Sequence, residues 1–148
     1  MLRLLEITYS NDKETPALYD SFADETALTA EFDTKLGQAM KSDAVKAELL
    51  VAFAQTGQII AQGYVSHDDT VSLSPRLVWV SVSDGVESAD QSKKTNVEEL
   101  SADFYIKRGS AKKNKDIDAI TILGVDGKSV TINDYWSRPA QPQEEVGE

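Results

Sequence analysis

Short apolar runs rich in β-branched residues, each closed by a turn sequence, constrain this chain most. The clearest pair is 119–125 and 129–132, with Asp126-Gly127 between them. Asp-Gly tolerates the positive φ values of a type I′ turn, whose twist matches that of the flanking strands. This segment therefore predicts a β-hairpin within a mainly antiparallel sheet.

Three other segments have the pattern of strands. Residues 2–9 alternate weakly between apolar and polar side chains, and residues 76–83 are apolar on both faces, as in a central strand. Residues 99–107 place apolar side chains at every second position, which predicts a further strand. The polar stretch 88–96 predicts a loop.

Residues 43–55 allow two interpretations. Their alanine and leucine content favours a helix, which Gly57 would end. As a strand, the segment places alternate apolar side chains on one face and turns at Thr56-Gly57 into a second strand over 58–66. We favour the hairpin.

The spacing of apolar residues changes from two to about four positions, which predicts one long helix beginning near Ser21. Either Ser21 or Asp24 can accept hydrogen bonds from the free amides of its first turn. Gly37 within the helix costs about 1 kcal/mol relative to alanine, so we expect a close neighbour there. The apolar stripe consists of Leu28, Phe32, Leu36 and Met40.

These patterns together predict an α+β fold, with an antiparallel sheet of about five to seven strands and one long amphipathic helix packed on one face. The 148 residues are 41% hydrophobic and 27% charged, as in an ordinary globular domain, which we assign to residues 1–138. Residues 139–148 are rich in proline, glutamine and glutamate and predict a disordered acidic tail. We detect no internal repeat with a fixed period.

The composition excludes several kinds of chemistry. Without cysteine the chain has no thiol nucleophile, disulfide or cysteine-bound metal, and its single histidine rules out a site with several histidines. No nucleotide-binding glycine motif, secretory leader or membrane-spanning stretch is apparent, so we expect no cofactor and no membrane association. We expect a cytoplasmic accessory protein, in the style of bacterial or phage proteins.

The three residues His67, Asp68 and Asp69 are the only place where an imidazole lies beside carboxylates. Such groups could bind a divalent cation or act as a general base, as in a metal-dependent hydrolase. Neighbouring residues of an extended chain point to opposite sides, however, so the triplet converges only in a special loop. We interpret it as a solvated connection and predict neither catalytic residues nor a metal site.

A basic island interrupts an otherwise acidic chain. The net charge is −10, whereas residues 93–115 contain seven bases and three acids. We predict a flexible loop over 107–115, with one aromatic ring beside it, as in sheet-based modules that bind single-stranded nucleic acid. The candidate residues for binding nucleic acid or another anion are Tyr105, Lys107, Arg108, Lys112, Lys113 and Lys115.

Tyr135 and Trp136 follow the last predicted strand and cannot both be buried in one layer, so one of them could anchor a protein partner. Our preferred hypothesis is a non-enzymatic module that binds another protein or itself. The alternatives are single-stranded nucleic-acid binding through 107–115, an acidic mimic of nucleic acid, and a metal-dependent hydrolase using residues 67–69.

Overall fold

The computed structural model describes residues 1–139, in which the element order ββαββ occurs twice. The elements are β1 Leu2–Ser10, β2 Lys13–Phe22, α1 Glu25–Lys41, β3 Ala47–Ala54, β4 Ile59–Ser66, β5 Arg76–Ser83, β6 Val86–Lys93, α2 Val97–Lys113, β7 Ala119–Val125 and β8 Val130–Ser137.

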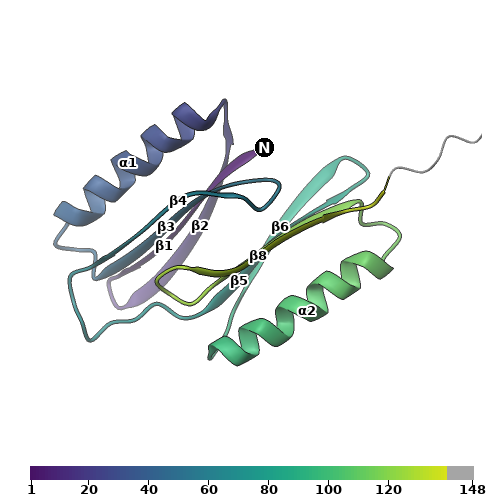
Figure 1. The fold of residues 1–148 in the computed structure, drawn as a ribbon. Coiled ribbons are helices and arrows are strands. Elements are labelled where there is room, and N and C mark those ends of the chain that lie inside the picture. Colours follow the sequence, from purple (N-terminus) through teal and green to yellow (C-terminus); the bar gives the residue numbers. More distant parts are fainter. Residues whose placement is uncertain (140–148) are drawn as a thin grey trace, which may run out of the picture.

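The strands form two antiparallel sheets of four, and each sheet has one helix on its outer face (Figure 1). The first sheet has the order β2-β1-β3-β4 and contacts α1, and the second has the order β6-β5-β7-β8 and contacts α2. The inner faces of the two sheets pack on each other, which gives four layers. The predicted α+β class is confirmed, but the structure has eight strands in two sheets and two helices in its described part, where we expected one sheet and one helix.

Alternation along the central strands explains these layers. In β3, Leu49, Val51 and Phe53 contribute to the core between the sheets, whereas Leu50 and Ala52 pack against α1. All seven residues of β7 are buried, and they divide between the inter-sheet core and α2 in the same way. A strand with two apolar faces must be covered on both sides. Here a helix covers one face of each central strand, and the opposite sheet covers the second face.

The two halves of the chain are two copies of one ββαββ unit. Both helices have 17 residues, and their capping residues Asp24 and Asn96 lie 72 positions apart. We detected no internal repeat with a fixed period in the sequence, whereas the structure contains a repeat whose spacing changes between 72 and 73 positions. Seven of the 17 helix positions carry the same residue in both copies: Leu28 and Leu100, Ala30 and Ala102, Phe32 and Phe104, Lys35 and Lys107, Gly37 and Gly109, Ala39 and Ala111, Lys41 and Lys113.

One extra residue in the first half interrupts the constant spacing. The two-residue turns Asn11-Asp12 and Asp84-Gly85 lie 73 positions apart, and all four residues have positive φ, as type I′ turns require. The helices are only 72 positions apart, so β2 contains the additional residue. It is accommodated as a β-bulge at Ser21, whose φ is 73°, where the pairing of β1 with β2 shifts register.

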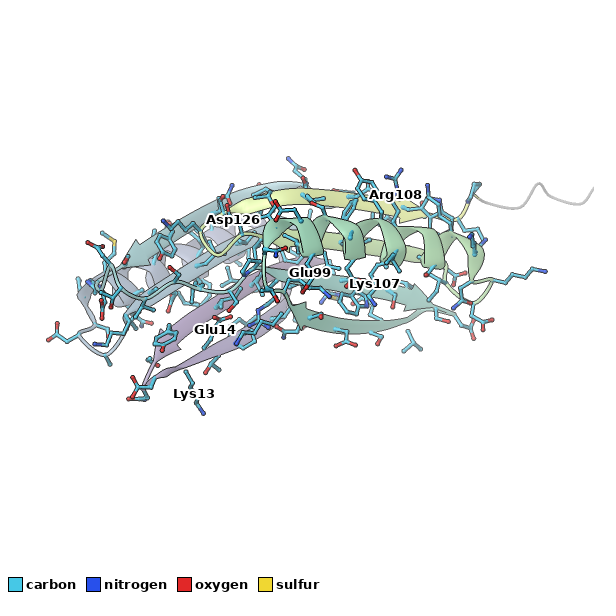
Figure 2. The ribbon with its side chains drawn as sticks, turned by 90° about the horizontal axis from the view of Figure 1, so that it is seen from below. Lys13, Glu14, Glu99, Lys107, Arg108 and Asp126 are labelled. Atoms are coloured by element: carbon cyan, nitrogen blue, oxygen red, sulfur yellow. The ribbon has the colours of Figure 1, made fainter. Side chains whose placement is uncertain are left out.

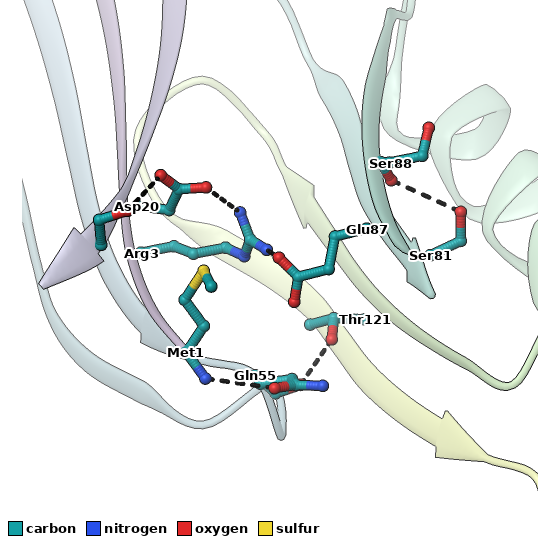
Figure 3. A network of polar contacts seen from close by, with 9 residues as sticks. Met1, Arg3, Asp20, Gln55, Ser81, Glu87, Ser88 and Thr121 are labelled. Carbon is teal, nitrogen blue, oxygen red and sulfur yellow. Dashed lines mark hydrogen bonds and ion pairs between the residues drawn. The ribbon is translucent and has the colours of Figure 1, made fainter. Parts of the chain in front are cut away.

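Two ion pairs cross between the halves. Arg3 of β1 pairs with Glu87 of β6, and Arg76 of β5 pairs with Glu14 of β2. The two arginines lie 73 positions apart, as do the two glutamates, so the pairs are related by approximate two-fold symmetry, like reciprocal contacts in a symmetric dimer. Figure 3 shows Arg3 between Glu87 and Asp20, with 3.4 Å to the Asp20 carboxylate.

The segment 99–107, predicted to be a strand, lies within α2. Leu100 and Phe104 are four positions apart, a spacing that fits both a strand and a helix. The helix is favoured because the Asn96 side chain accepts a hydrogen bond from the Glu99 amide at 2.8 Å and caps the first turn. Ile106, the last member of the predicted strand face, is 61% exposed.

Other predictions have mixed outcomes. Strands at 2–9 and 76–83 and the hairpin over 43–66 are confirmed, and the first helix begins at Glu25 with Asp24 as its cap. The prediction of a loop over 88–96 is wrong, because most of these residues belong to β6. β6 is an edge strand, and its polar sequence does not show the apolar pattern by which a strand is recognised.

Two predictions that involved glycines, at Gly37 and at Asp126-Gly127, are also wrong in detail. A side-chain carbon added at Gly37 would have no neighbour within 4 Å, so the expected close contact is absent. In the 119–132 hairpin only Gly127 of the Asp-Gly pair has positive φ, so the turn is a four-residue loop and not type I′. A side chain at Gly127 would come within 2.4 Å of the Leu73 carbonyl oxygen, which explains the glycine. Residues 140–148, most of the predicted tail, lie outside the described residues.

Candidate functional site

The predicted basic site lies on a helix and its end, and the prediction of a flexible loop between two strands is wrong. All but one of the six predicted residues belong to α2, and Lys115 follows its C-terminus. Regular backbone fixes their relative positions at 3.6 residues per turn, so their grouping can be derived from the helix geometry.

Two large apolar side chains occupy the solvent side of α2. Leu100, Phe104 and Ala111 face the second sheet, whereas Tyr105 and Ile106 are 64% and 61% exposed. We call this surface the outer face of α2. It consists of Ala102, Tyr105, Ile106, Gly109, Lys112 and Lys113, which share one side of the helix by its periodicity.

Lys107 and Arg108 flank the outer face and are occupied by contacts with the second sheet. The Lys107 ammonium lies 4.6 Å from the centre of the Trp79 ring and 3.9 Å from Asp103. Arg108 pairs with Asp134 of β8 at 3.2 Å. Figure 2 shows the two side chains on opposite edges of α2. These two bases are therefore engaged with residues of α2 and the second sheet, and they are only partly available to a ligand.

The basic charge available for binding is concentrated at the C-terminal end of α2. Lys112, Lys113 and Lys115 are exposed, and no carboxylate among residues 1–139 lies within 4.0 Å of their ammonium groups. Lysines at this end also favour the helix dipole, which is a structural reason for their presence.

The equivalent face of α1 is polar at the positions of Tyr105 and Ile106, whereas Met40, at the position of Lys112, is 59% exposed. Asp33 and Thr34 occupy the positions of Tyr105 and Ile106, 72 residues earlier. The repeat thus shows that the fold does not require apolar side chains at these two positions of the helix. The exposed pair Tyr105 and Ile106 has no counterpart at the same positions of α1.

The residues 67–69 do not converge on a metal. The His67 Nε2–H donates to the Ala39 carbonyl at 2.8 Å. Asp68 accepts hydrogen bonds from the hydroxyl and amide of Thr70, which lower its pKa. Across the described part of the chain, no three histidine or carboxylate side chains form a group suited to a metal ion.

The two terminal aromatic residues lie on the edge strand β8. Trp136 packs against the apolar cluster beneath α2, with the Arg138 guanidinium 5.1 Å from its ring. Tyr135 lies opposite Thr121 of β7 and is half-buried. The structure therefore gives Trp136 a packing role, and its proposed interface role stays a prediction.

One polar residue that sequence reasoning missed is Glu48. It is 4% exposed and lies in β3, on the side that faces α1. The sequence does mark this residue, because Glu48 is the one charged residue in the otherwise apolar run 47–54.

Within residues 1–139, neither helix has the length and apolar character needed to cross a membrane. Comparison of the chain with protein-family models, curated proteins and solved structures found no match.

Proposed function

We propose that the protein is an interaction module that binds an acidic, amphipathic segment of another protein through the outer face of α2. The observation that carries this proposal is the exposure of Tyr105 and Ile106 side by side, next to lysines without acidic partners in the described chain. Apolar side chains with a charged rim are typical of protein interfaces, in which aromatic residues are enriched.

The same features favour a protein partner over nucleic acid. Two of the five bases in 107–115 are engaged with Asp103 and Asp134, and the chain as a whole carries −10. A nucleic-acid site needs a continuous basic groove with stacking rings, whereas this surface is a convex helix with an aliphatic side chain at its centre. A helical partner with leucines facing Tyr105 and Ile106, and glutamates facing the lysines, complements it.

The test uses a defined probe, a fluorescein-labelled synthetic helix with leucine at every third and fourth position and glutamate elsewhere. We expect saturable binding by fluorescence anisotropy. The double variant Y105A/I106A should weaken binding at least about tenfold, since truncating central interface residues typically costs more than 1 kcal/mol each. Replacing Lys112, Lys113 and Lys115 by glutamine should weaken binding and flatten its salt dependence.

The matched control is D33A/T34A, which changes the equivalent positions of α1 and should leave binding unchanged. Absence of saturable binding, or equal binding by Y105A/I106A, would contradict the proposal. Binding of a 15-nucleotide oligo-dT with a log–log salt slope of several units, lost with the three lysines but not with Tyr105 and Ile106, would assign the surface to nucleic acid instead.

A further inference from the structure

An apolar groove opens between α1 and the edge strand β4. It has a volume of about 410 Å³, and Met40 on its rim is 59% exposed. The groove belongs to the first half of the chain and the outer face of α2 to the second half, and the two helices lie on opposite outer faces of the molecule (Figure 1). The residues that line the groove are Leu36, Met40, Gly63, Tyr64, Val65 and His67.

The repeat shows that the fold does not require this groove. Arg108 of the second half occupies the position of Leu36. Its ion-pair partner Asp134, at 3.2 Å, occupies the position of Gly63. The first half has neither of these charges, so the equivalent space is open and apolar there. The groove is therefore a candidate for function and not a necessity of the fold.

Two carboxylates lie beyond the groove on the same side of α1, toward the N-terminus of the helix. Asp33 precedes Met40 by seven positions and so shares its side of the helix, and Glu25 lies about two turns further along. Both acids line a second hollow of about 440 Å³. In the part of the chain that the structure describes, no lysine or arginine approaches either carboxylate within 4.0 Å. An apolar patch is thus followed along α1 by an acidic patch without basic partners.

The outer face of α2 carries the complementary pattern. Lys113 lies seven positions after Ile106, or about 10 Å further along the helix axis at 1.5 Å per residue. Asp33 has the same spacing from Met40, but in the opposite direction along its helix. Antiparallel docking therefore brings the exposed apolar pair of α2 to the groove and the lysines to the acids at the same time. A parallel arrangement would carry the lysines past Met40, away from both acids.

We propose that the segment bound by the outer face of α2 is α1 of a second copy of this chain, docked antiparallel with Tyr105 and Ile106 in the groove. This inference rests on the proposed function and names its partner. The charges are complementary, because three lysines without acidic partners in the described chain meet two acids without basic ones. The lysines are Lys112, Lys113 and Lys115.

Such contacts join the copies head to tail. The two surfaces that meet are different, since the apolar pair lies in the second half of one copy and the groove in the first half of the next. Because α1 and α2 lie on opposite outer faces, one copy can bind two others and association continues beyond a dimer. A single helix in a groove is a small interface, so association should be weak and depend on concentration.

Sedimentation velocity of the full chain measures this assembly. We expect the wild type to form a series of oligomers as its concentration rises, and to lose them as added salt screens the charges. Y105A/I106A removes the apolar pair and M40E places a carboxylate in the groove, so each should weaken self-association at least about tenfold. Q38E adds the same charge on the opposite side of α1, at another exposed position, and should assemble like the wild type.

An equimolar mixture of the two impaired variants gives the sharpest test. M40E retains the apolar pair and Y105A/I106A retains the groove, so a mixed pair has one intact contact. We expect 1:1 dimers and nothing larger, although each variant alone stays monomeric. A mixture that also stays monomeric, or a wild type that forms dimers and no larger species, would overturn the proposal.

Disulfide trapping tests the orientation, because the chain contains no cysteine of its own. In the same mixture, K113C on the M40E chain should form a disulfide with D33C on the Y105A/I106A chain. It should form none with D43C, which follows the C-terminus of α1 beyond the other end of the groove. Preferential trapping with D43C would overturn antiparallel docking.

Peptide binding separates this inference from the proposed function. D33A/T34A leaves the outer face of α2 intact, so it should bind the acidic helical peptide like the wild type but self-associate more weakly. Saturable peptide binding by a wild type that stays monomeric up to millimolar concentration would overturn this inference and leave the proposed function standing. If the wild type neither binds the peptide nor self-associates, both are wrong.

Discussion

The two halves of this protein show how one backbone can serve two chemistries. Their helices have the same length and equivalent caps, and seven identical residues face the same directions. The first half places Glu6 and Glu48 beneath its helix and Asp33 and Thr34 at the outside positions of Tyr105 and Ile106. The second half places Trp79 and Ile120 beneath its helix and Tyr105 and Ile106 outside. Features shared by both halves therefore belong to the fold, and features present in one half are candidates for function.

The crossed ion pairs give the largest expected difference between the halves. R76A leaves Glu14 without its partner in a nearly closed environment, where the side chains of the pair are 7% and 6% exposed. We expect a loss of about 3–5 kcal/mol in the free energy of unfolding, as for other buried pairs broken on one side. R3A should cost less, about 1–2 kcal/mol, because Glu87 and Asp20 are 27% and 48% exposed and can be hydrated.

Urea unfolding of the two variants measures this difference. The control is the double variant E14L/R76M, which removes both charges and should recover most of the stability lost in R76A. Equal losses for R3A and R76A would show that the two pairs are energetically equivalent despite their different exposure.

The next largest effect concerns Glu48 and depends on pH. Its pKa rises from an ordinary 4.5 to about 7 on folding, so the folded state retains a proton that the unfolded state has released. The contribution of Glu48 to stability should therefore fall as pH rises from 4.5 to 7 and then level off. E48Q has no such proton and should be more stable than wild type by about 2–3 kcal/mol at pH 8, with little difference near pH 4.

Thermal or urea unfolding from pH 4 to pH 8 provides the measurement. D33N, which removes an exposed carboxylate from α1, is expected to unfold in parallel with wild type over this range. A pH profile for E48Q that runs parallel to wild type would mean that Glu48 is ionised at an ordinary pKa in the folded protein.

The smallest effects concern the paired glycines of the two helices. Neither Gly37 nor Gly109 has an atom within 4 Å of an added side-chain carbon. G37A and G109A should therefore each stabilise the protein by about 0.5–1 kcal/mol, because alanine is the better helix former. Only G109A adds an atom to the outer face of α2, so only this variant should change binding of the acidic helical peptide. Equal effects of both variants on peptide binding would argue against that surface.

Prediction from sequence succeeded where apolar patterns were strong. The runs 76–83 and 119–125 became central strands, and the first helix was found from Leu28, Phe32 and its cap Asp24. The prediction of secondary structure failed for β6 and α2. An edge strand such as β6 needs no apolar alternation, and Leu100 and Phe104 fit the spacing of either a strand or a helix.

The candidate sites were predictable only in part. The bases near 107–115 are visible in the sequence, but their division into engaged and available groups depends on Asp103 and Asp134, whose positions follow from the fold. Glu48 is visible as one acid in an apolar strand, yet the cavity beside it results from the packing of α1 on the sheet. The repeat was hidden because equivalent strands share few identical residues, such as Arg3 and Arg76, and because the bulge at Ser21 shifts the spacing by one.

The crossed pairs and the shared inter-sheet core have a consequence for the connection between the halves. Only residues 67–75 join β4 to β5, while the contacts that hold the two sheets together involve side chains from both copies. A protease cut at the exposed Asp69 should therefore leave two fragments that stay bound to each other as a heterodimer. The covalent link would then serve mainly to raise the effective concentration of one fragment around the other.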